Sequence, residues 1–148
     1  MENWDFYQAN INDRVASIYL DLSFAVTAPD SHLPKLAWYW IKMDHPRSDG
    51  LSSDEELDRL NEHEDELISH LSNTRTKYVG RITTQGRREF YFYIPEESSV
   101  QDVLRALIGE NPRYLYQIGE KADPSWHHYF DVLYPGPNGL SQIKSRNA

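Results

Sequence analysis

The sequence predicts an α+β domain, in which a mainly antiparallel sheet of about six strands packs in two layers with three helices. Two observations carry this prediction. Short segments with alternating or aromatic-rich patterns follow one another across tight turns, which is typical of hairpins. Three other segments repeat apolar residues every three or four positions, the period of an amphipathic helix. The predicted order is βββ-α-ββ-α-β-α, in a single domain over residues 1–135.

The first three predicted strands precede the first helix. Residues 4–11 form an aromatic-rich strand, and residues 15–22 alternate between apolar and polar side chains. The turn-forming pair Asn12-Asp13 separates these segments, so we expect a hairpin. A third strand, again aromatic-rich, is predicted at residues 36–43.

The first predicted helix begins at Ser52 or Ser53, because each has a glutamate three residues later and can form a capping box. Two strands follow at residues 78–83 and 88–94, joined as a hairpin by a Gln-Gly turn. The apolar stripe of the helix consists of Leu57, Leu60, Leu67, Ile68 and Leu71.

The remaining elements alternate between helix and strand. A second helix starts at Ser98 or Ser99 and stops before a glycine. A sixth strand is predicted at residues 114–118, and a third helix has Asp123 as its N-cap with proline at its first position. Residues 136–148 are turn-rich and predict a flexible C-terminal tail.

The composition excludes several classes of site. None of the 148 residues is Cys, which excludes disulfides, thiolate metal sites and Cys nucleophiles. No apolar run reaches the roughly 18–20 residues that span a bilayer, and the acidic N-terminus is unlike a signal peptide. We therefore expect a cytoplasmic protein that does not enter a membrane. The net charge of −8 makes nucleic acid an unfavourable main partner, since phosphate binding needs clustered Lys and Arg.

The negative charge is confined to one stretch of the chain. Residues 44–66 hold ten acids and two bases, a net charge of −8, whereas the other 125 residues hold 13 of each sign. Such a local field steers partners, and like charges at i,i+4 cost helix stability. The simpler alternative is a solvated helix face. We predict a docking face for a basic protein, made of Asp54, Glu55, Glu56, Asp58, Glu62, Asp65 and Glu66.

Glu64 lies in the middle of the apolar stripe, where steps of three and four place it on the inward face of the helix. Arg81, in the following strand, is the expected partner. The pair is either a buried tie between helix and sheet, because an unpaired buried carboxylate is costly, or Glu64 is a general base with a raised pKa. We favour the tie. The alternative is an enzyme whose cleft adds Asp123, Trp126 and Tyr129 to this pair.

The histidines do not predict a metal site. His63, Glu66 and His70 share one helix face, but the two histidines are roughly 10 Å apart along the axis. No pair shows the His-x-x-x-His spacing that binds zinc from a helix. We interpret the histidines as surface residues and predict neither metal nor cofactor.

Residues 75–88 carry five bases and no acid. With Tyr91 and Tyr93 close by in sequence, this hairpin is a candidate RNA-binding surface. The simpler interpretation, which we favour, is that its bases partly neutralise the acidic helix that precedes it.

Several motifs occur in order along the chain: Trp4-x-x-Tyr7, Pro46-x-x-Asp49-Gly50-Leu51, Glu64-Asp65-x-Leu67, Val79-Gly80-Arg81-x-Thr83, Arg88-x-Phe90-Tyr91-Phe92-Tyr93, and Asp123-x-x-Trp126-x-x-Tyr129 with Leu133-Tyr134-Pro135. Together they resemble the bacterial family known as domain of unknown function 695, over about residues 4–135. The resemblance implies no reaction, because the family has no established activity. Its pattern includes Glu64 and Arg81, and a similarity to proteins that join this domain to a ribonuclease-regulator-type domain implies an acidic, protein-binding role.

We therefore expect a non-enzymatic protein-binding or regulatory module. Its acidic loop and helix would dock a basic partner, such as a nuclease or toxin that it restrains. The alternatives are an uncharacterised enzyme with a cleft around Glu64 and Arg81, and an RNA-binding protein that uses residues 75–88.

Overall fold

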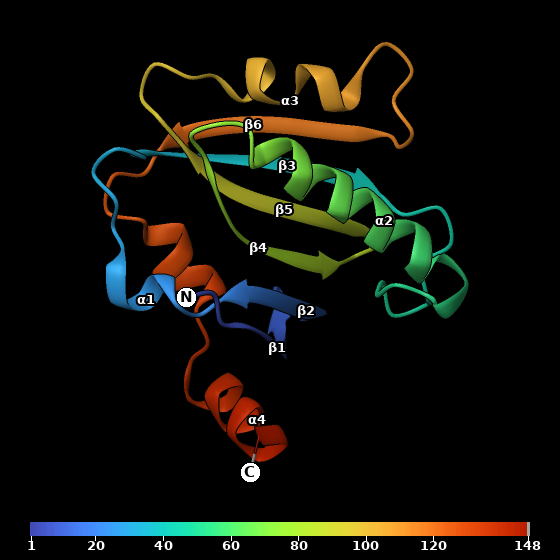
Figure 1. Ribbon diagram of the computed structural model, residues 1–148. Helices are drawn as coiled ribbons and strands as arrows, with labels where there is room; N and C mark the ends of the chain where they lie inside the picture. The colour runs from blue at the N-terminus through green and yellow to red at the C-terminus, as the bar shows by residue number, and fades with distance from the viewer. Residues whose placement is uncertain (148) are drawn as a thin grey trace.

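The computed structural model describes residues 1–147 and contains a six-stranded sheet in which every neighbouring pair is antiparallel (Figure 1). The order across the sheet is β1-β2-β4-β5-β3-β6. The predicted α+β class with an antiparallel sheet of six strands is confirmed. The strands are β1 (Trp4–Ile11), β2 (Arg14–Asp21), β3 (Lys35–Lys42), β4 (Lys77–Thr84), β5 (Arg87–Ile94) and β6 (Tyr116–Ala122).

Both predicted hairpins form around two-residue turns. Asn12 and Asp13 have φ angles of 52° and 64°, and the Gln85-Gly86 turn has 52° and 80°. Two successive residues with positive φ match the right-handed twist of the flanking strands, which is why such turns favour Asn, Asp and Gly. The turn chemistry therefore sets the register of β1 on β2 and of β4 on β5, in the second pair as far as Gly80, where a bulge shifts the register.

Five helical segments lie within residues 1–147, where the sequence predicted three. They are α1 (Phe24–Thr27), α2 (Asp54–Leu71), α3 (Val100–Ile108), the short π-helix η1 (His128–Leu133) and α4 (Pro137–Asn147). None of them is long and apolar enough to cross a bilayer. α2 and α3 begin after Ser53 and Ser99, as predicted, and the Ser99 hydroxyl accepts from the backbone N–H of Asp102. The capping box predicted for α2 does not form, because Ser53 makes no side-chain cap bond and the Glu56 carboxylate bonds to the backbone of Asp44 and His45 instead.

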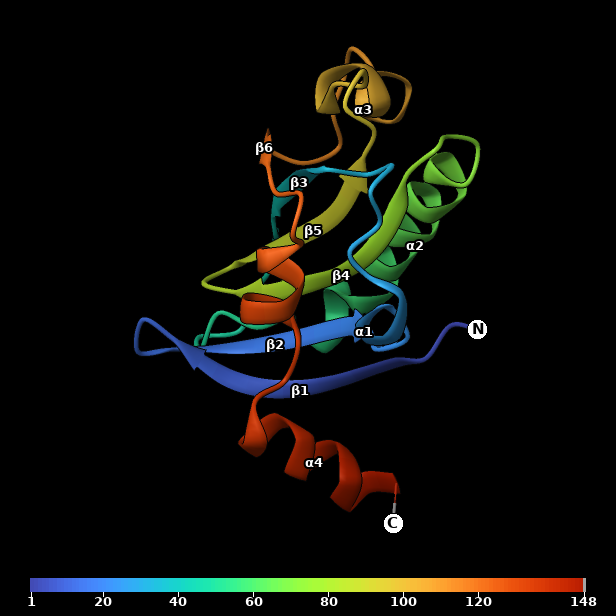
Figure 2. The ribbon, with the colours of Figure 1, turned by 90° about the vertical axis from the view of Figure 1, so that its left-hand side faces the viewer.

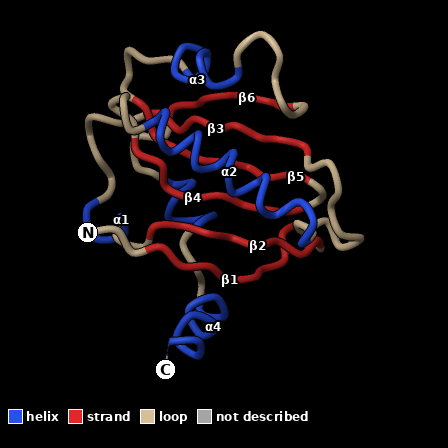
Figure 3. Tube along the Cα trace, turned by 45° about the vertical axis from the view of Figure 1, so that its right-hand side comes forward, coloured by secondary structure: helices blue, strands red, loops and turns tan. Residues whose placement is uncertain are grey.

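Helices lie on both faces of the sheet, whereas the predicted two-layer arrangement has helices on one face only (Figure 3). α2 and α3 cover one face, where Leu60, Leu67 and Leu104 meet Phe90 and Phe92. η1 covers the other face because its aromatic residues are buried with side chains of β1, β2 and β5. The sheet therefore has a core on each side.

The C-terminal segment differs most from the prediction. Residues 136–148 were expected to form a flexible tail, but residues Pro137–Asn147 form α4, which packs against β1 (Figure 2). Ile143 is 7% exposed and belongs to the core on the η1 face. The polar sequence of α4 hides this contact, because a single buried isoleucine gives little periodicity to detect.

α2 covers only part of its face of the sheet. The core beneath α2 draws its strand residues from β3 and β5 with partly buried contributions from β4 and β6, and none from β1 or β2. Figure 3 shows α2 running obliquely across β3, β5 and β4, with most of β1 and β2 below it. The α2-facing sides of β1 and β2 are therefore left without a helix over them.

Candidate functional site

Glu64 and Arg81 form the predicted ion pair between α2 and β4. Glu64 is buried, and one carboxylate oxygen accepts from the Arg81 guanidinium. The hydroxyl of Tyr78 donates to the second oxygen over 3.0 Å. Both oxygens of Glu64 are thus occupied by donors from the sheet, which is the arrangement of a structural tie.

Arg88 is a second guanidinium beside the same carboxylate, and sequence reasoning missed it. Its Nη1 lies 3.6 Å from Glu64 Oε1, and its side chain is 2% exposed. Burial, reinforced by the charge of Arg81, lowers the pKa of Arg88 to about 10. Burial and the Glu64 charge raise the pKa of Tyr78 well above its ordinary value. One buried cation, one partly exposed cation and a neutral phenol therefore surround one carboxylate.

Aromatic rings extend this cluster toward the edge of the sheet. The guanidinium of Arg81 lies 4.5 Å from the ring centre of Tyr19 on β2. Trp4 on β1 stacks on Tyr19 with ring centres 4.8 Å apart and lies 5.3 Å from Tyr78. These rings occupy the part of the face that α2 leaves uncovered.

A groove of about 830 Å³ runs between α2 and these aromatic residues. Glu64 and Arg81 line it, so the ion pair is tied to the fold and also open to a groove. The side chain of Arg81 is 20% exposed. Other lining residues include Trp4, Tyr19, Asp65, Ile68, Lys77 and Tyr78.

The predicted docking face is exposed at six of its seven positions. Glu56 is the exception: it is fully buried, and its carboxylate accepts the backbone N–H groups of Asp44 and His45, each over 2.7 Å. Glu56 therefore joins the loop at Asp44 and His45 to α2 and does not belong to the exposed face. The exposed members, which we call the α2 acidic face, are Asp54, Glu55, Asp58, Glu62, Asp65 and Glu66.

The model of one protein family, described as a family of unknown function (DUF695), matches residues 2–134. The chain belongs to the DUF695 family. The predicted resemblance is thereby confirmed, and the match includes the groove and the α2 acidic face but ends before α4. Searches of curated proteins and of solved structures found no match.

The basic segment of this DUF695 domain is not a free cationic surface. Arg81 and Arg88 meet Glu64, while the other three bases pair with acids elsewhere: Arg75 with Glu97 at 2.5 Å, Lys77 with Asp30 at 3.1 Å and Arg87 with Glu89 at 2.6 Å. Only two of the five bases therefore reach the acidic helix. The pairing leaves little unopposed charge for a phosphate backbone, which binds to clustered free bases.

His63 and His70 differ from the surface residues that we predicted. His63 is buried, its Nε2 is 2.8 Å from the Tyr39 hydroxyl, and burial lowers its pKa. His70 contacts the carbonyl oxygen of Val103 on α3 at 2.5 Å. Within residues 1–147 no group of three or more His, Asp or Glu side chains is placed to hold a metal ion.

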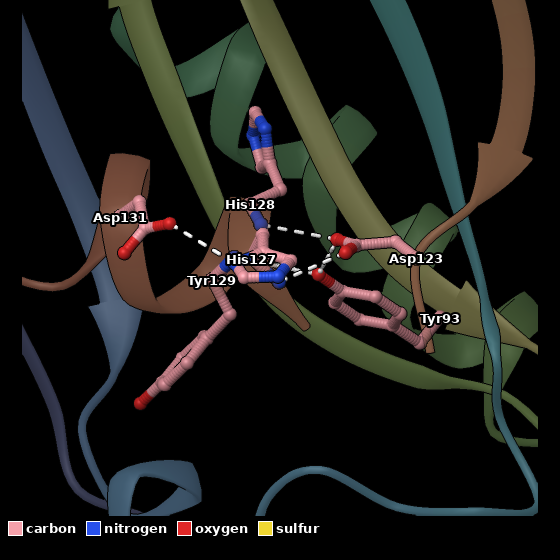
Figure 4. Close-up of polar contacts among 6 residues, drawn as sticks. All are labelled: Tyr93, Asp123, His127, His128, Tyr129 and Asp131. Carbon is pink, nitrogen blue, oxygen red and sulfur yellow. Dashed lines mark hydrogen bonds and ion pairs between the residues drawn. The ribbon is translucent and has the colours of Figure 1, made fainter. Parts of the chain in front are cut away.

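Asp123 organises a second polar cluster on the η1 face (Figure 4). Its carboxylate accepts from the Tyr93 hydroxyl at 2.8 Å and from the backbone N–H groups of His127 at 2.8 Å and His128 at 3.0 Å. Burial alone would raise the pKa of Asp123, but these donors outweigh it and the pKa is lowered. The helix predicted to start at Asp123 is wrong in its position: Asp123 bonds to the backbone at the start of η1, but the N-cap of this π-helix is His127. The helix begins only at His128, because Trp126 adopts a φ of 57° and stacks on Tyr93.

The extended cleft of the enzyme alternative does not assemble. Trp126 and Tyr129 belong to the core on the η1 face, and Asp123 bonds to Tyr93 of that same core. Glu64 lies in α2 on the opposite face of the sheet. The sheet therefore separates the two groups of residues, and the groove at Glu64 draws on β1, β2 and β4 instead.

Proposed function

We propose that this DUF695 member is a non-enzymatic, cytoplasmic protein-binding module that docks a basic partner on the α2 acidic face. The observation that supports the proposal is the meeting of two features at one place. Six exposed carboxylates lie on a single helix, and the aromatic groove runs along the same helix. Asp65 belongs to both.

The two features supply different parts of an interface. Exposed charges of one sign raise the association rate and select a partner of opposite charge. Aromatic and aliphatic side chains that become buried carry most of the binding energy. Trp4 and the 41% exposed Ile68, both on the groove, are suited to that second role. A basic protein with a protruding apolar or aromatic side chain is the partner that fits both.

The α2 acidic face should destabilise the isolated protein, and this supports the same proposal. Asp58, Glu62 and Glu66 follow one another at i,i+4 on the exposed side of α2, where like charges destabilise a helix. A basic partner would relieve that repulsion. Proteins that act on nucleic acids carry clustered Lys and Arg, so a nuclease or a nucleic-acid-directed toxin is the class of partner that the face fits.

Affinity capture from a lysate of the source organism tests the proposal, at low and at moderate salt. The wild-type chain should retain a basic protein whose recovery falls as salt rises, because salt screens exposed charges. The variant Glu62→Gln, Asp65→Asn, Glu66→Gln should lose it. A matched control, Asp13→Asn, Glu96→Gln, Glu110→Gln, removes the same charge from exposed acids elsewhere and should keep it. Equal capture by both variants would contradict docking on α2.

The second candidate is an enzyme at the Glu64–Arg81 groove, which one observation favours: the groove opens directly on this ion pair. Against it, both oxygens of Glu64 already accept hydrogen bonds, so neither is free to take a proton from a substrate. A substrate screen with the wild type and with Glu64→Gln decides whether the groove is an active site. A turnover that is lost in a folded Glu64→Gln protein would establish the enzyme, and no turnover in wild type would remove it.

A further inference from the structure

β1 is an edge strand whose own sequence does little to protect it. It lies at one end of the sheet and pairs only with β2. Edge strands are usually guarded by Pro, Lys or several charges, since a free row of N–H and C=O groups invites another strand. β1 contains neither Pro nor Lys and has a single charged residue, Asp5, among three aromatic residues.

The backbone groups on the free edge belong to the even-numbered residues of β1. The two-residue turn pairs Ile11 with Arg14, and alternate residues of an antiparallel strand direct their hydrogen bonds to opposite sides. The odd-numbered residues therefore bond to β2, as the bond from Leu22 N–H to the Asn3 carbonyl just before the strand illustrates. Phe6 and Gln8 consequently present their N–H and C=O groups outward.

Gln142 of α4 occupies the outward groups of Gln8 as a neighbouring strand would. The N–H of Gln8 donates to Oε1 of Gln142 over 2.9 Å, and Nε2 of Gln142 donates to the carbonyl oxygen of Gln8 over 2.9 Å. One side-chain amide thus supplies the acceptor and the donor that the backbone of an added strand supplies.

Arg146 and Asp5 occupy the outward groups of Phe6. Arg146 donates to the carbonyl oxygen of Phe6, and the N–H of Phe6 donates to Asp5 Oδ1 over 2.8 Å. The Asp5 carboxylate is itself held by Arg146 at 2.7 Å and by Asn147 at 3.2 Å. All four edge groups of Phe6 and Gln8 are therefore satisfied by side chains, and α4 provides or positions each of them.

α4 has few other contacts that hold it in place. Gly139 and Ile143 are its buried residues, and most of the rest are exposed and polar. The family match ends at residue 134, so the strand is part of the shared domain and its cap is not. Figure 2 shows α4 lying beyond β1 at the end of the chain.

We propose that α4 is a releasable cap on β1, and that its release allows the β1 edge to pair antiparallel with the β1 edge of a second copy of this chain. The four capped groups are self-complementary. When Tyr7 of one copy faces Tyr7 of the other, Gln8 of each copy lies opposite Phe6 of the other. Each such pair then exchanges two backbone hydrogen bonds. Asp5 then faces Ala9, so no like charges oppose each other in the pair.

The test detaches α4 in the full-length chain with Gln142→Ala, Ile143→Asp and Arg146→Ala. The first and third substitutions remove the edge bonds, and the second places a charge where an isoleucine was buried. Hydrogen exchange should show loss of protection in α4 with β2, β4 and β5 still protected. Light scattering should then give twice the monomer mass. The control Lys144→Ala with Ser145→Ala alters exposed α4 residues and should stay monomeric with α4 protected.

Adding Gln8→Pro to the triple variant identifies the surface that associates. Proline removes only the outward N–H of Gln8, and edge strands tolerate it, so the pairing of β1 with β2 remains. The added proline should restore the monomer. The proposal is overturned by a triple variant that stays monomeric with α4 released, by a dimer that persists with Gln8→Pro, or by α4 that stays protected despite all three substitutions.

Discussion

Glu64 is the point at which α2 and the sheet are joined. Its position in the apolar stripe, with Arg81 in the next strand, is enough to predict the pair. Tyr78 and Arg88 complete the cluster, and one signal for Arg88 was present: Arg88, Phe90 and Phe92 alternate along β5, so they share a face. The signal was missed because five bases in one segment suggested an exposed surface.

Replacing Glu64 tests whether the cluster stabilises the fold. Glu64→Gln leaves Arg81 and Arg88 beside a neutral amide and should lower the free energy of unfolding by about 3 kcal/mol, since an unpaired buried charge is costly. Urea denaturation measures the loss. Asp65→Asn, on the neighbouring exposed residue, should change stability by less than about 0.5 kcal/mol. Equal effects of the two substitutions would mean that the buried pair contributes nothing.

His128 should make the fold sensitive to acid. Burial lowers its pKa to about 4, with Lys121 adding to the effect and Asp123 opposing it, whereas the ordinary value is 6.5. Between pH 4 and 6.5, the unfolded chain therefore binds a proton at His128 and the folded chain does not. The stabilisation is present above pH 6.5 and is lost as the pH falls toward 4, by about 3 kcal/mol.

Comparing two adjacent histidines isolates this contribution. In the wild type the ring centres of His128 and Tyr91 are 4.1 Å apart, and His128→Phe keeps an aromatic ring at this position. The variant should lose less stability than the wild type between neutral pH and pH 4. His127→Phe, at an exposed side chain, should leave the loss unchanged. Chemical denaturation across that pH range measures both, and identical profiles for the two variants would show that His128 is not responsible.

Among the secondary-structure elements, the strands, the hairpins, α2 and α3 are those that local sequence specifies. Alternation, two-residue turns, apolar helical periodicity and the Ser99 cap all act within a few residues, so each prediction needed no knowledge of the fold. η1 and α4 were predicted poorly for the opposite reason. Trp126 adopts a left-handed backbone conformation while it stacks on Tyr93, and α4 is held by contacts with β1 more than 130 residues away in sequence.

The loop that precedes α2 offers a test of how that helix is anchored. Glu56→Ala removes the acceptor of two backbone N–H groups and should lower the free energy of unfolding by about 2 kcal/mol. Glu55→Ala, at the adjacent exposed residue, should be close to neutral. Thermal unfolding distinguishes them. A cost that is the same at both positions would contradict the role assigned to Glu56.

The arrangement of the complete domain explains why charge and groove coincide. α2 carries the acids and covers only the middle of the sheet, so its exposed side borders the bare aromatic surface of β1 and β2. The sequence locates the acids along the chain. The groove exists only because β2 pairs with β4, which brings Trp4 and Tyr19 next to residues more than fifty positions away.

Removing like charges from α2 should stabilise the isolated protein. Glu62→Gln with Glu66→Gln relieves repulsion at i,i+4 and should raise the free energy of unfolding by about 0.5 kcal/mol at low salt. The gain should vanish at high salt, where exposed charges are screened. The pair Glu96→Gln with Glu110→Gln is the control and should give no such gain. A loss of stability in the α2 variant would show that these acids have partners within the fold.

Nine of the eleven helices and strands within residues 1–147 overlap a segment predicted from the sequence, the exceptions being α1 and α4, but the way these elements assemble could not be predicted. The residues alone determine the α+β class, the hairpins, the family, the acidic stretch and the inward carboxylate Glu64, because each depends on neighbours in sequence. Tertiary structure alone decides that Glu56 is buried, that Glu64 borders a groove, that helices cover both faces of the sheet, and that α4 caps β1. Each of these depends on contacts between segments far apart in the chain, which no local pattern records.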